Sequence, residues 1–387
     1  MQRLTHPPRA SWQQRVESVG LPHHTGTDGA PYWDEGASYV LTAADVDVLE
    51  AATNELHRLC LTAVDHVVAE RRWAELAIPD AVAPLVERSW RGAVGGAARR
   101  APEPTLYGRF DLAYDGRTPP RLLEYNADTP TALVEAAVAQ WYWLQDVEPS
   151  GDQFNSIHER LVAAWPGMVD AGARPGAGAR VHFACADDVE DLATVDYLRD
   201  TAQQAGLTTQ RLLVSEIGWD AGRRRFVDLD DAPIAAAFKL YPWEWMVRET
   251  FGTHLVESAP ATHWIEPPWK LVLSNKGILA ILWELFPDHP NLLPAYFDPA
   301  MLEAYARKPL LSREGANVSL VMFGEELAAS DGTYGAEGYV YQAIAPLPRF
   351  DGHTPVLGSW VVAGEAAGVG IREADGPITT NTSRFVP

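Results

Sequence analysis

The chain has 387 residues, of which 47% are hydrophobic, enough for two or three domain-sized units of an ordinary globular protein. Its formal net charge of −21 works against nucleic acid and anionic lipid as partners, because both are bound chiefly by clustered Lys and Arg. No apolar run approaches the roughly 18 residues that cross a bilayer, so we expect a cytoplasmic protein without a membrane partner. The acidic surface either keeps the protein soluble or attracts a cationic amine.

Two regions of contrasting character open the chain. Residues 1–40 are rich in Pro, Gly and His, which predicts extended or irregular structure. Residues 42–75 instead carry apolar side chains at helical spacing, and Thr42 with Asp45 makes a helix start signal, so we expect a helix there. The apolar positions of this helix are Val46, Leu49, Leu56, Leu59, Val64, Val67 and Val68.

The next segments predict a β-hairpin followed by a helix. Two strand-like runs, 106–114 and 121–126, are separated by residues 115–120, whose Asp, Gly and Pro are typical of turns. After them, the Ala-rich apolar run 131–144 predicts a buried helix, with Pro130 at its first position.

The second half of the chain alternates strand-like and helical patterns. Strand-like pieces at 181–185 and 208–214 flank an amphipathic segment at 188–205, which predicts a βαβ unit. The whole pattern indicates an α+β fold with mixed and antiparallel sheets. Later strands are predicted at residues 271–273, 318–322, 338–342 and 357–362.

The predicted hairpin carries polar side chains that could bind a metal ion. Asp111, Glu124 and Asn126 place hard oxygen ligands on adjacent strands, and Glu124 and Asn126, two residues apart, leave the same face. Mg²⁺ prefers such oxygen donors. Arg109 and Asp111 share a face of the neighbouring strand in the same way. A solvated polar face is the alternative interpretation of these four residues.

Two lysines stand beside loops that could bind phosphate. Lys276 lies within 274–278, and Lys308 precedes 311–317, a Gly-containing turn whose backbone NH groups could fold over phosphates. The alternative is that both lysines are solvated at the surface. The sequence has no GxxxxGK[ST], strand-led GxGxxG, HExxH or GxSxG pattern, which disfavours P-loop and Rossmann sites, a zinc site and a nucleophile elbow.

An ordered series of stretches resembles the glutathionylspermidine synthase family, in its synthetase half, which is an ATP-grasp carboxylate–amine ligase. The resemblance runs from about Tyr32 onward, and the series is far more specific than any single motif. Its stretches are 109–111 (Arg-Phe-Asp), 123–130 (Leu-Glu-Tyr-Asn-Ala-Asp-Thr-Pro), 275–276 (Asn-Lys) through 281–283 (Ile-Leu-Trp), 308–310 (Lys-Pro-Leu), 341–342 (Tyr-Gln), 370–372 (Gly-Ile-Arg) and 381–387 (Asn-Thr-Ser-Arg-Phe-Val-Pro).

The resemblance implies ATP and Mg²⁺ as cofactors and gives roles to the hairpin and the lysines. Asp111, Glu124 and Asn126 would hold Mg²⁺. Lys276 and Lys308 would contact the nucleotide phosphates. The resemblance thus favours these roles over a solvated polar face and surface lysines.

The same resemblance assigns most of the remaining site residues. Gln342 would lie near the adenine. Arg109 and Arg372 would stabilise charge on a reacting acyl phosphate, a role that suits a guanidinium because it keeps its proton and grips oxygens in pairs. Thr129 and Thr131 do not follow from the resemblance: we expect them to contact the substrate because the N-terminus of the helix after Pro130 favours a carboxylate.

The implied reaction joins a small-molecule carboxylate to an amine. ATP would phosphorylate the carboxylate, the amine would attack the acyl phosphate, and residues 312–317 would act as a mobile lid that excludes water. The alternatives are a kinase-like phosphotransfer and a regulatory protein that only binds ATP. We expect three subregions: 42–150 with the metal-binding hairpin, 179–265 as a βαβ-type substrate subdomain, and 270–387 with the nucleotide site and lid.

Two departures from the family pattern limit the expected substrates. Bifunctional members carry an additional amidase domain, for which 387 residues leave no room, so we expect synthetase activity alone. Glutathione-using members have a serine-rich, cysteine-containing stretch where this chain has Thr129-Pro130-Thr131-Ala132. We therefore expect another peptide or an amino acid to supply the carboxylate.

Overall fold

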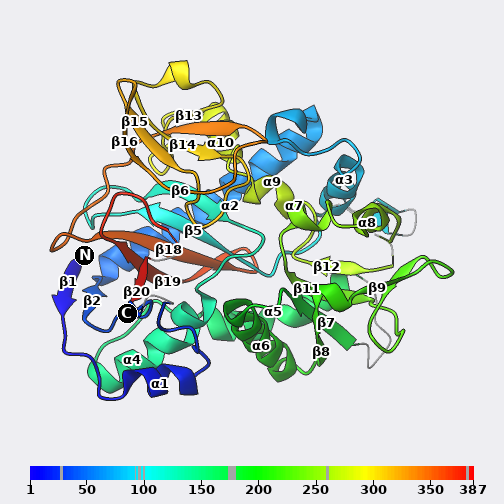
Figure 1. Cartoon of the computed structure of the whole chain (residues 1–387), viewed down its shortest axis with the longest axis horizontal. Helices are drawn as coiled ribbons and strands as arrows, with labels where there is room; N and C mark the ends of the chain where they lie inside the picture. The colour runs from blue at the N-terminus through cyan, green and yellow to red at the C-terminus, as the bar shows by residue number, and fades with distance from the viewer. Residues whose placement is uncertain are drawn as a thin grey trace.

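Three sheets of at least four strands, with helices packed around them, make up the computed structural model of the chain (Figure 1). The structure describes residues 1–26, 29–91, 93–94, 97–98, 101–172, 180–258, 261–380 and 383–387. Residue 179 of the predicted substrate subdomain and residues 381–382 of the C-terminal stretch lie outside this part. None of the helices described is long and apolar enough to span a membrane. The mixture of parallel and antiparallel sheets confirms the predicted α+β class.

The central sheet is antiparallel and joins segments that are far apart in the sequence. Its order is β20-β19-β18-β5-β6, so the predicted hairpin β5–β6 is extended by the C-terminal strands. The register places Asp111 opposite Glu124 and Arg109 opposite Asn126. These strands are β5 (Tyr107–Ala113), β6 (Arg121–Asn126), β18 (Thr354–Val362), β19 (Glu365–Ala374) and β20 (Arg384–Val386).

A second antiparallel sheet, yellow and orange in Figure 1, lies beside the hairpin edge of the central sheet. Its order is β13-β17-β14-β15-β16, and the loop 310–318 connects β14 to β15. The strands predicted at 318–322 and 338–342 belong to this sheet. Its members are β13 (Ala295–Tyr296), β14 (Ala304–Pro309), β15 (Ser319–Met322), β16 (Glu325–Ala329) and β17 (Tyr339–Ala343).

The third sheet is parallel and contains the predicted βαβ unit. Its order is β12-β11-β7-β8, and α6 connects β7 to β8 and packs on both. The Asp188 carboxylate caps α6 by accepting from the backbone NH groups of Glu190 and Asp191. The elements are β7 (Arg180–Cys185), α6 (Val189–Gln204), β8 (Thr208–Leu213), β11 (Ala236–Leu240) and β12 (His263–Ile265).

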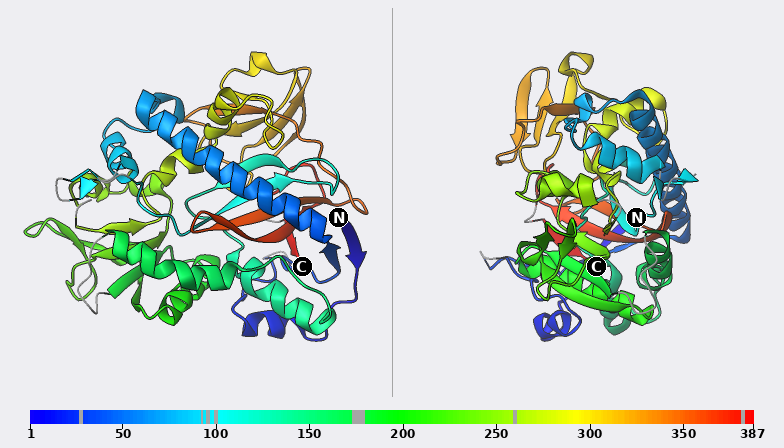
Figure 2. Two further views of the ribbon diagram at one scale, coloured as in Figure 1. Left: turned by 180° about the vertical axis from the view of Figure 1, so that it is seen from behind. Right: turned by 90° about the vertical axis from the view of Figure 1, so that its right-hand side faces the viewer.

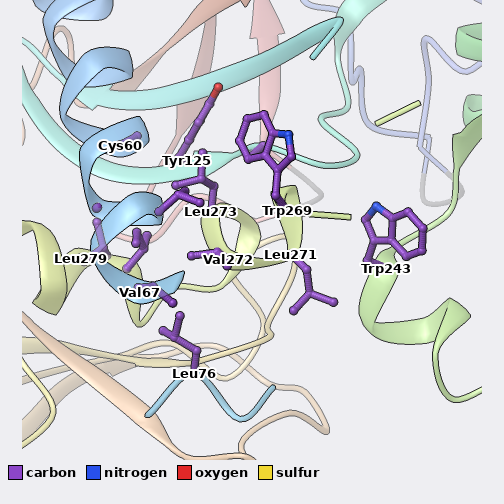
Figure 3. Close-up of a cluster of buried hydrophobic side chains, with 14 of the residues drawn as sticks. Cys60, Val67, Leu76, Tyr125, Trp243, Trp269, Leu271, Val272, Leu273 and Leu279 are labelled. Atoms are coloured by element: carbon purple, nitrogen blue, oxygen red, sulfur yellow. The ribbon is translucent and has the colours of Figure 1, made fainter. Parts of the chain in front are cut away.

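The helix α2 (Ala43–Glu70) crosses the central sheet and packs on β18 and β19 (Figure 2). It begins with the predicted start signal, because Thr42 and Asp45 form a reciprocal capping box. Buried side chains of α2, among them Cys60 and Val67, meet Tyr125 of β6 and Leu279 in one core (Figure 3). The hairpin therefore packs against a buried apolar core.

The remaining elements complete the layers, and most of them are short. The helices are α1 (Trp12–Ser18), α3 (Ala83–Arg91), α4 (Gln140–Val147), α5 (Ile157–Gly172), α7 (Trp243–Met246), α8 (Gly252–Ser258), α9 (Lys270–Ser274) and α10 (Ile278–Leu285). Single helical turns occur at Ala74–Leu76, Glu135–Ala139, Val214–Glu216 and Pro299–Met301. Paired strands are β1 (Gln2–Thr5) with β2 (Ala37–Val40), β3 (Ala93–Val94) with β4 (Ala97–Ala98), and β9 (Gly218–Asp220) with β10 (Arg225–Val227).

Three local predictions were wrong. The run 271–273 lies in α9 rather than in a strand, because Lys270 N bonds to Pro267 O and starts a helical turn. The helix after the hairpin begins at residue 133 and not at Pro130, since Ala132 has φ +64°. The N-terminal segment is partly regular, with β1 paired to β2 and α1 between them.

Candidate functional site

A cavity of about 410 Å³ lies between the central sheet and the second antiparallel sheet. Strands β5, β6, β18 and β19 form one wall, and β14, β15 and β17 form the other. Nine of the ten site residues predicted from the sequence line this cavity: Arg109, Asp111, Glu124, Asn126, Thr129, Thr131, Lys308, Gln342 and Arg372.

Lys276 reaches the same cavity through Glu124. Its Nζ lies 3.0 Å from Glu124 Oε2 and donates to Ser312 O at 2.7 Å. Lys308 Nζ donates to Leu123 O and to Gln342 Oε1, both at 2.7 Å. The structure therefore brings together two lysines from distant segments and the acidic hairpin.

The charges of this group depend on one another. Burial alone would raise the pKa of Glu124, but the positive charges of Lys276 and Lys308 lower that pKa to about 2. Burial lowers the pKa of Lys308 to about 8, against the attraction of Glu124. At neutral pH Glu124 is therefore ionised, and Lys308 is still mostly protonated.

Arg109 holds Asp111 from the same strand. Arg109 Nε donates to Asp111 Oδ1 at 2.7 Å and Nη2 donates to Oδ2 at 3.1 Å, a bidentate pair. Burial raises the pKa of Asp111 despite this cation. Arg109 also donates to Thr131 O, so it fixes the backbone just before the helix that begins at residue 133.

Arg372 presents an unused donor at the cavity. Its Nη2 donates to Thr380 O at 2.6 Å, while its Nε is buried and has no hydrogen-bond partner in the described part of the chain. A buried donor without a partner costs about 1–3 kcal/mol. An anionic ligand that reached this nitrogen would offset that cost.

The loop 312–317 contacts the opposite wall through a residue that the sequence interpretation did not single out. Arg313 donates to Thr129 Oγ1 at 2.7 Å and lies 3.2 Å from Glu244 Oε1 in α7. Its guanidinium lies 5.5 Å from the ring of Trp245. The sequence shows Arg313 as a cation in the Gly-containing loop, but it does not show which residues Arg313 contacts.

The cavity lining also includes apolar side chains from both walls. Gln342 lines the cavity as well, and its Nε2 donates to Leu122 O at 2.9 Å. A flat aromatic base would fit between apolar side chains from both walls. These are Leu123, Ala306, Leu320, Ile344 and Val356.

An acidic group at the start of α6 was also missed from the sequence. Burial, followed by the charge of Glu135, raises the pKa of Glu190 to about 7, and Arg372 acts electrostatically on the same group. Burial raises the pKa of Asp191 to about 6. His23 Nε2 lies 3.1 Å from Glu135 Oε1. The sequence does contain the acidic run 187–191, but such a run is typical of the start of a helix and did not indicate a site.

The donor set of the hairpin fits a hard divalent cation. Asp111 and Glu124 are cross-strand partners, and Asn126 Nδ2 donates to Glu124 Oε1 at 3.1 Å. Within the described residues, no group of three His, Cys, Asp or Glu could hold a metal ion by itself. Mg²⁺ commonly uses only one or two carboxylates with phosphate oxygens and water, so two carboxylates and an amide oxygen suffice beside a nucleotide.

The fold is that of glutathione synthetase-like proteins. The structure of a glutathione synthetase-like effector from Globodera pallida, solved in its apo form, matches with a TM-score of 0.56 at 10% identity, over 97% of this chain and 95% of that one. Residues 3–387 match the model of the glutathionylspermidine synthase preATP-grasp family, and the chain belongs to that family. By family it is an ATP-dependent carboxylate–amine ligase.

Two relatives show how far the similarity extends. A Haemophilus influenzae protein provisionally named an acid–amine ligase is 40% identical over 404 residues, which cover 100% of this chain and 99% of that protein. The bifunctional glutathionylspermidine synthetase/amidase of Escherichia coli is 28% identical over 379 residues. That alignment covers 90% of this chain but only 58% of the larger enzyme.

Proposed function

We propose that the protein joins a peptide-like or amino-acid carboxylate to an amine, with ATP and Mg²⁺, through an acyl phosphate. The observation that carries this proposal is the meeting of Lys276, Glu124 and Lys308 at one cavity between two sheets. A cavity lined by both charged and apolar side chains suits a nucleotide, whose phosphates and base need those two kinds of contact.

The chemistry follows from the charges of the reacting groups. A carboxylate is a poor electrophile, so one of its oxygens takes the γ-phosphoryl group of ATP and ADP leaves. The amine nitrogen then attacks the carbonyl carbon, loses a proton, and phosphate departs as the amide forms. Lys276 and Lys308 offset the charge that spreads over the phosphoryl oxygens during the first step.

The arginines act on the reacting acyl group. The buried Arg372 Nε would donate a hydrogen bond to an acyl-phosphate oxygen or to the tetrahedral oxyanion. Arg109, held in place by Asp111, orients the 129–131 segment where the carboxylate substrate would dock. Thr129 would contact that substrate through its hydroxyl, beside Arg313.

Asp111, Glu124 and Asn126 would hold Mg²⁺. When bound, the metal ion supplies charge neutralisation at the phosphate oxygens. Loop 312–317 would exclude water from the acyl phosphate, because its Arg313 reaches Thr129 on the opposite wall.

The acidic group at α6 supports an amine as the second substrate. Glu190, with its pKa raised to about 7, is able to accept a proton near neutral pH. Glu190 does not line the cavity, but Arg372, which does, acts on it electrostatically.

The test is to measure ADP and phosphate release with Mg²⁺ across a panel of peptides, amino acids and amines, and to weigh the product. Condensation predicts a product lighter than the summed substrates by one water. A phosphorylated product without the amine would support a kinase-like activity, and ATP binding without turnover would support a regulatory protein. Glu124→Gln should nearly abolish turnover with the fold intact; an unchanged rate would refute the metal assignment.

A further inference from the structure

A second cavity of about 410 Å³ lies at the carboxyl ends of the parallel strands. Residues 185–187 leave β7, residues 213–215 leave β8, and Tyr241 follows β11, and all of them line it. The chain passes from β7 to β8 on one side of β7, and β11 then pairs on the other side. In open α/β sheets, ligands bind outside the carboxyl ends of the strands where the strand order reverses in this way.

The walls of this second cavity are apolar and well packed. Phe226, Leu255 and Trp264 are at most 3% exposed, so the floor is part of the core. Phe251, in contrast, is 44% exposed. The volume falls within the range of small-molecule sites. The other apolar lining residues are Leu213, Val214, Ile217 and Met246.

The ionised groups of this cavity are all acidic. Asp187 and Glu249 are exposed, and no Lys, Arg or His occurs among the described residues that line it. Tyr241 Oη donates to Glu249 Oε1 at 2.6 Å, which orients that carboxylate. An apolar cavity with two carboxylates selects for positive charge on an apolar body, and an organic acid would be repelled.

The second cavity is separate from the nucleotide cavity but shares its loops. The two have no described lining residue in common. The segment after β11 carries Tyr241, which lines the second cavity, and then Glu244 of α7, which pairs with Arg313 of the first cavity. The ring of Tyr241 packs edge-on against Trp245 with centroids 5.4 Å apart, and Arg313 lies over the same Trp245.

We propose that this second cavity binds a small organic cation with an apolar body, such as an arylalkyl or alkyl primary amine. The ammonium would lie against Asp187 and Glu249, and the apolar body would contact Phe226, Leu255 and Trp264. Because the two cavities are separate, this binding does not depend on the ligase reaction or on ATP.

The experiment is calorimetric titration of the full chain with 2-phenylethylamine, 2-phenylethanol and 3-phenylpropanoate, without nucleotide. The amine is expected to bind, the neutral alcohol about tenfold more weakly, and the acid not measurably. Asp187→Asn with Glu249→Gln should bring the amine down to the affinity of the alcohol. Ser215→Trp, which fills the cavity, should abolish binding of both, and Glu70→Gln, an exposed carboxylate at the end of α2, should change nothing.

The outcomes separate this proposal from the ligase proposal. Equal binding of amine and alcohol, or amine binding that survives both Ser215→Trp and the double substitution, would overturn the cation site. A far-ultraviolet circular dichroism spectrum like that of the unaltered protein shows that the fold of each variant is intact. If Ser215→Trp does not fold, the double substitution decides alone, because both of its side chains are exposed.

Discussion

Replacing Asp128 by Asn tests whether one buried ion pair joins the hairpin to the parallel sheet. Asp128 follows β6 by two residues, and its carboxylate accepts from Lys239 Nζ of β11 at 2.5 Å and from Trp243 N of α7 at 2.9 Å. Asp128 is 0% exposed and Lys239 is 1% exposed. The variant keeps the shape of the side chain but leaves the lysine charge without its partner.

The expected loss of unfolding free energy is about 3–5 kcal/mol, the usual cost of removing one member of a buried pair. Burial already lowers the pKa of Lys239, and Asp128 is the first group that opposes this effect. Urea unfolding followed by tryptophan fluorescence measures the loss. Adding Lys239→Met to Asp128→Asn removes the unpaired charge and should restore much of the stability.

The control and the refuting result are equally specific. Glu70→Gln removes an exposed carboxylate at the end of α2 and should leave the unfolding midpoint unchanged. If Asp128→Asn costs less than about 1 kcal/mol, the pair contributes no more than a surface salt bridge, and the reasoning fails.

Three further predictions concern the nucleotide cavity, its loop and a buried histidine. Lys308→Met should weaken ATP binding at least about tenfold by calorimetry, because it removes a buried cation; Arg307→Met, on the opposite face of β14, should not. Arg313→Ala removes the contacts to Glu244 and Thr129, so amide hydrogen exchange in loop 312–317 should become faster, while Arg307→Ala should leave it unchanged. Burial lowers the pKa of His57 from 6.5 to about 4, so the fold favours the neutral imidazole. The contribution of His57 to the free energy of unfolding is therefore complete above pH 6.5 and should fall by about 3 kcal/mol as the pH drops toward 4. The His57→Gln variant should lack this loss.

The elements that could be predicted are those whose signals are local. The turn residues 115–120 and the flanking apolar runs were sufficient for β5 and β6, and the capping pair Thr42 and Asp45 for the start of α2. The run 271–273 could not be assigned, because a short apolar segment looks the same in a buried strand and a buried helix. The late start of the helix at residue 133 depends on Arg109, which holds Thr131 O from a distant strand.

The site residues divide in the same way. The two-residue spacing of Glu124 and Asn126 is a local signal, and it correctly predicted a shared strand face. The approach of Lys276 to Glu124 is a tertiary contact, and only the ordered family resemblance pointed to it. Arg313 and Glu190 had neither a local pattern nor a family motif to mark them, because the groups that they interact with lie on other segments.

The overall charge of the chain also shows where sequence reasoning stops. A net charge of −21 disfavours extended polyanions, yet the described lining of the nucleotide cavity holds five basic side chains against four acidic ones. A small anion experiences this local balance rather than the whole surface, because the Debye length at physiological salt is only about 8 Å. An acidic surface is therefore compatible with the proposed site for nucleotide phosphates, where Arg109 and Lys308 are buried. The basic lining residues are Arg109, Lys308, Arg313, Arg349 and Arg372, and the acidic ones are Asp111, Glu124, Glu314 and Asp375.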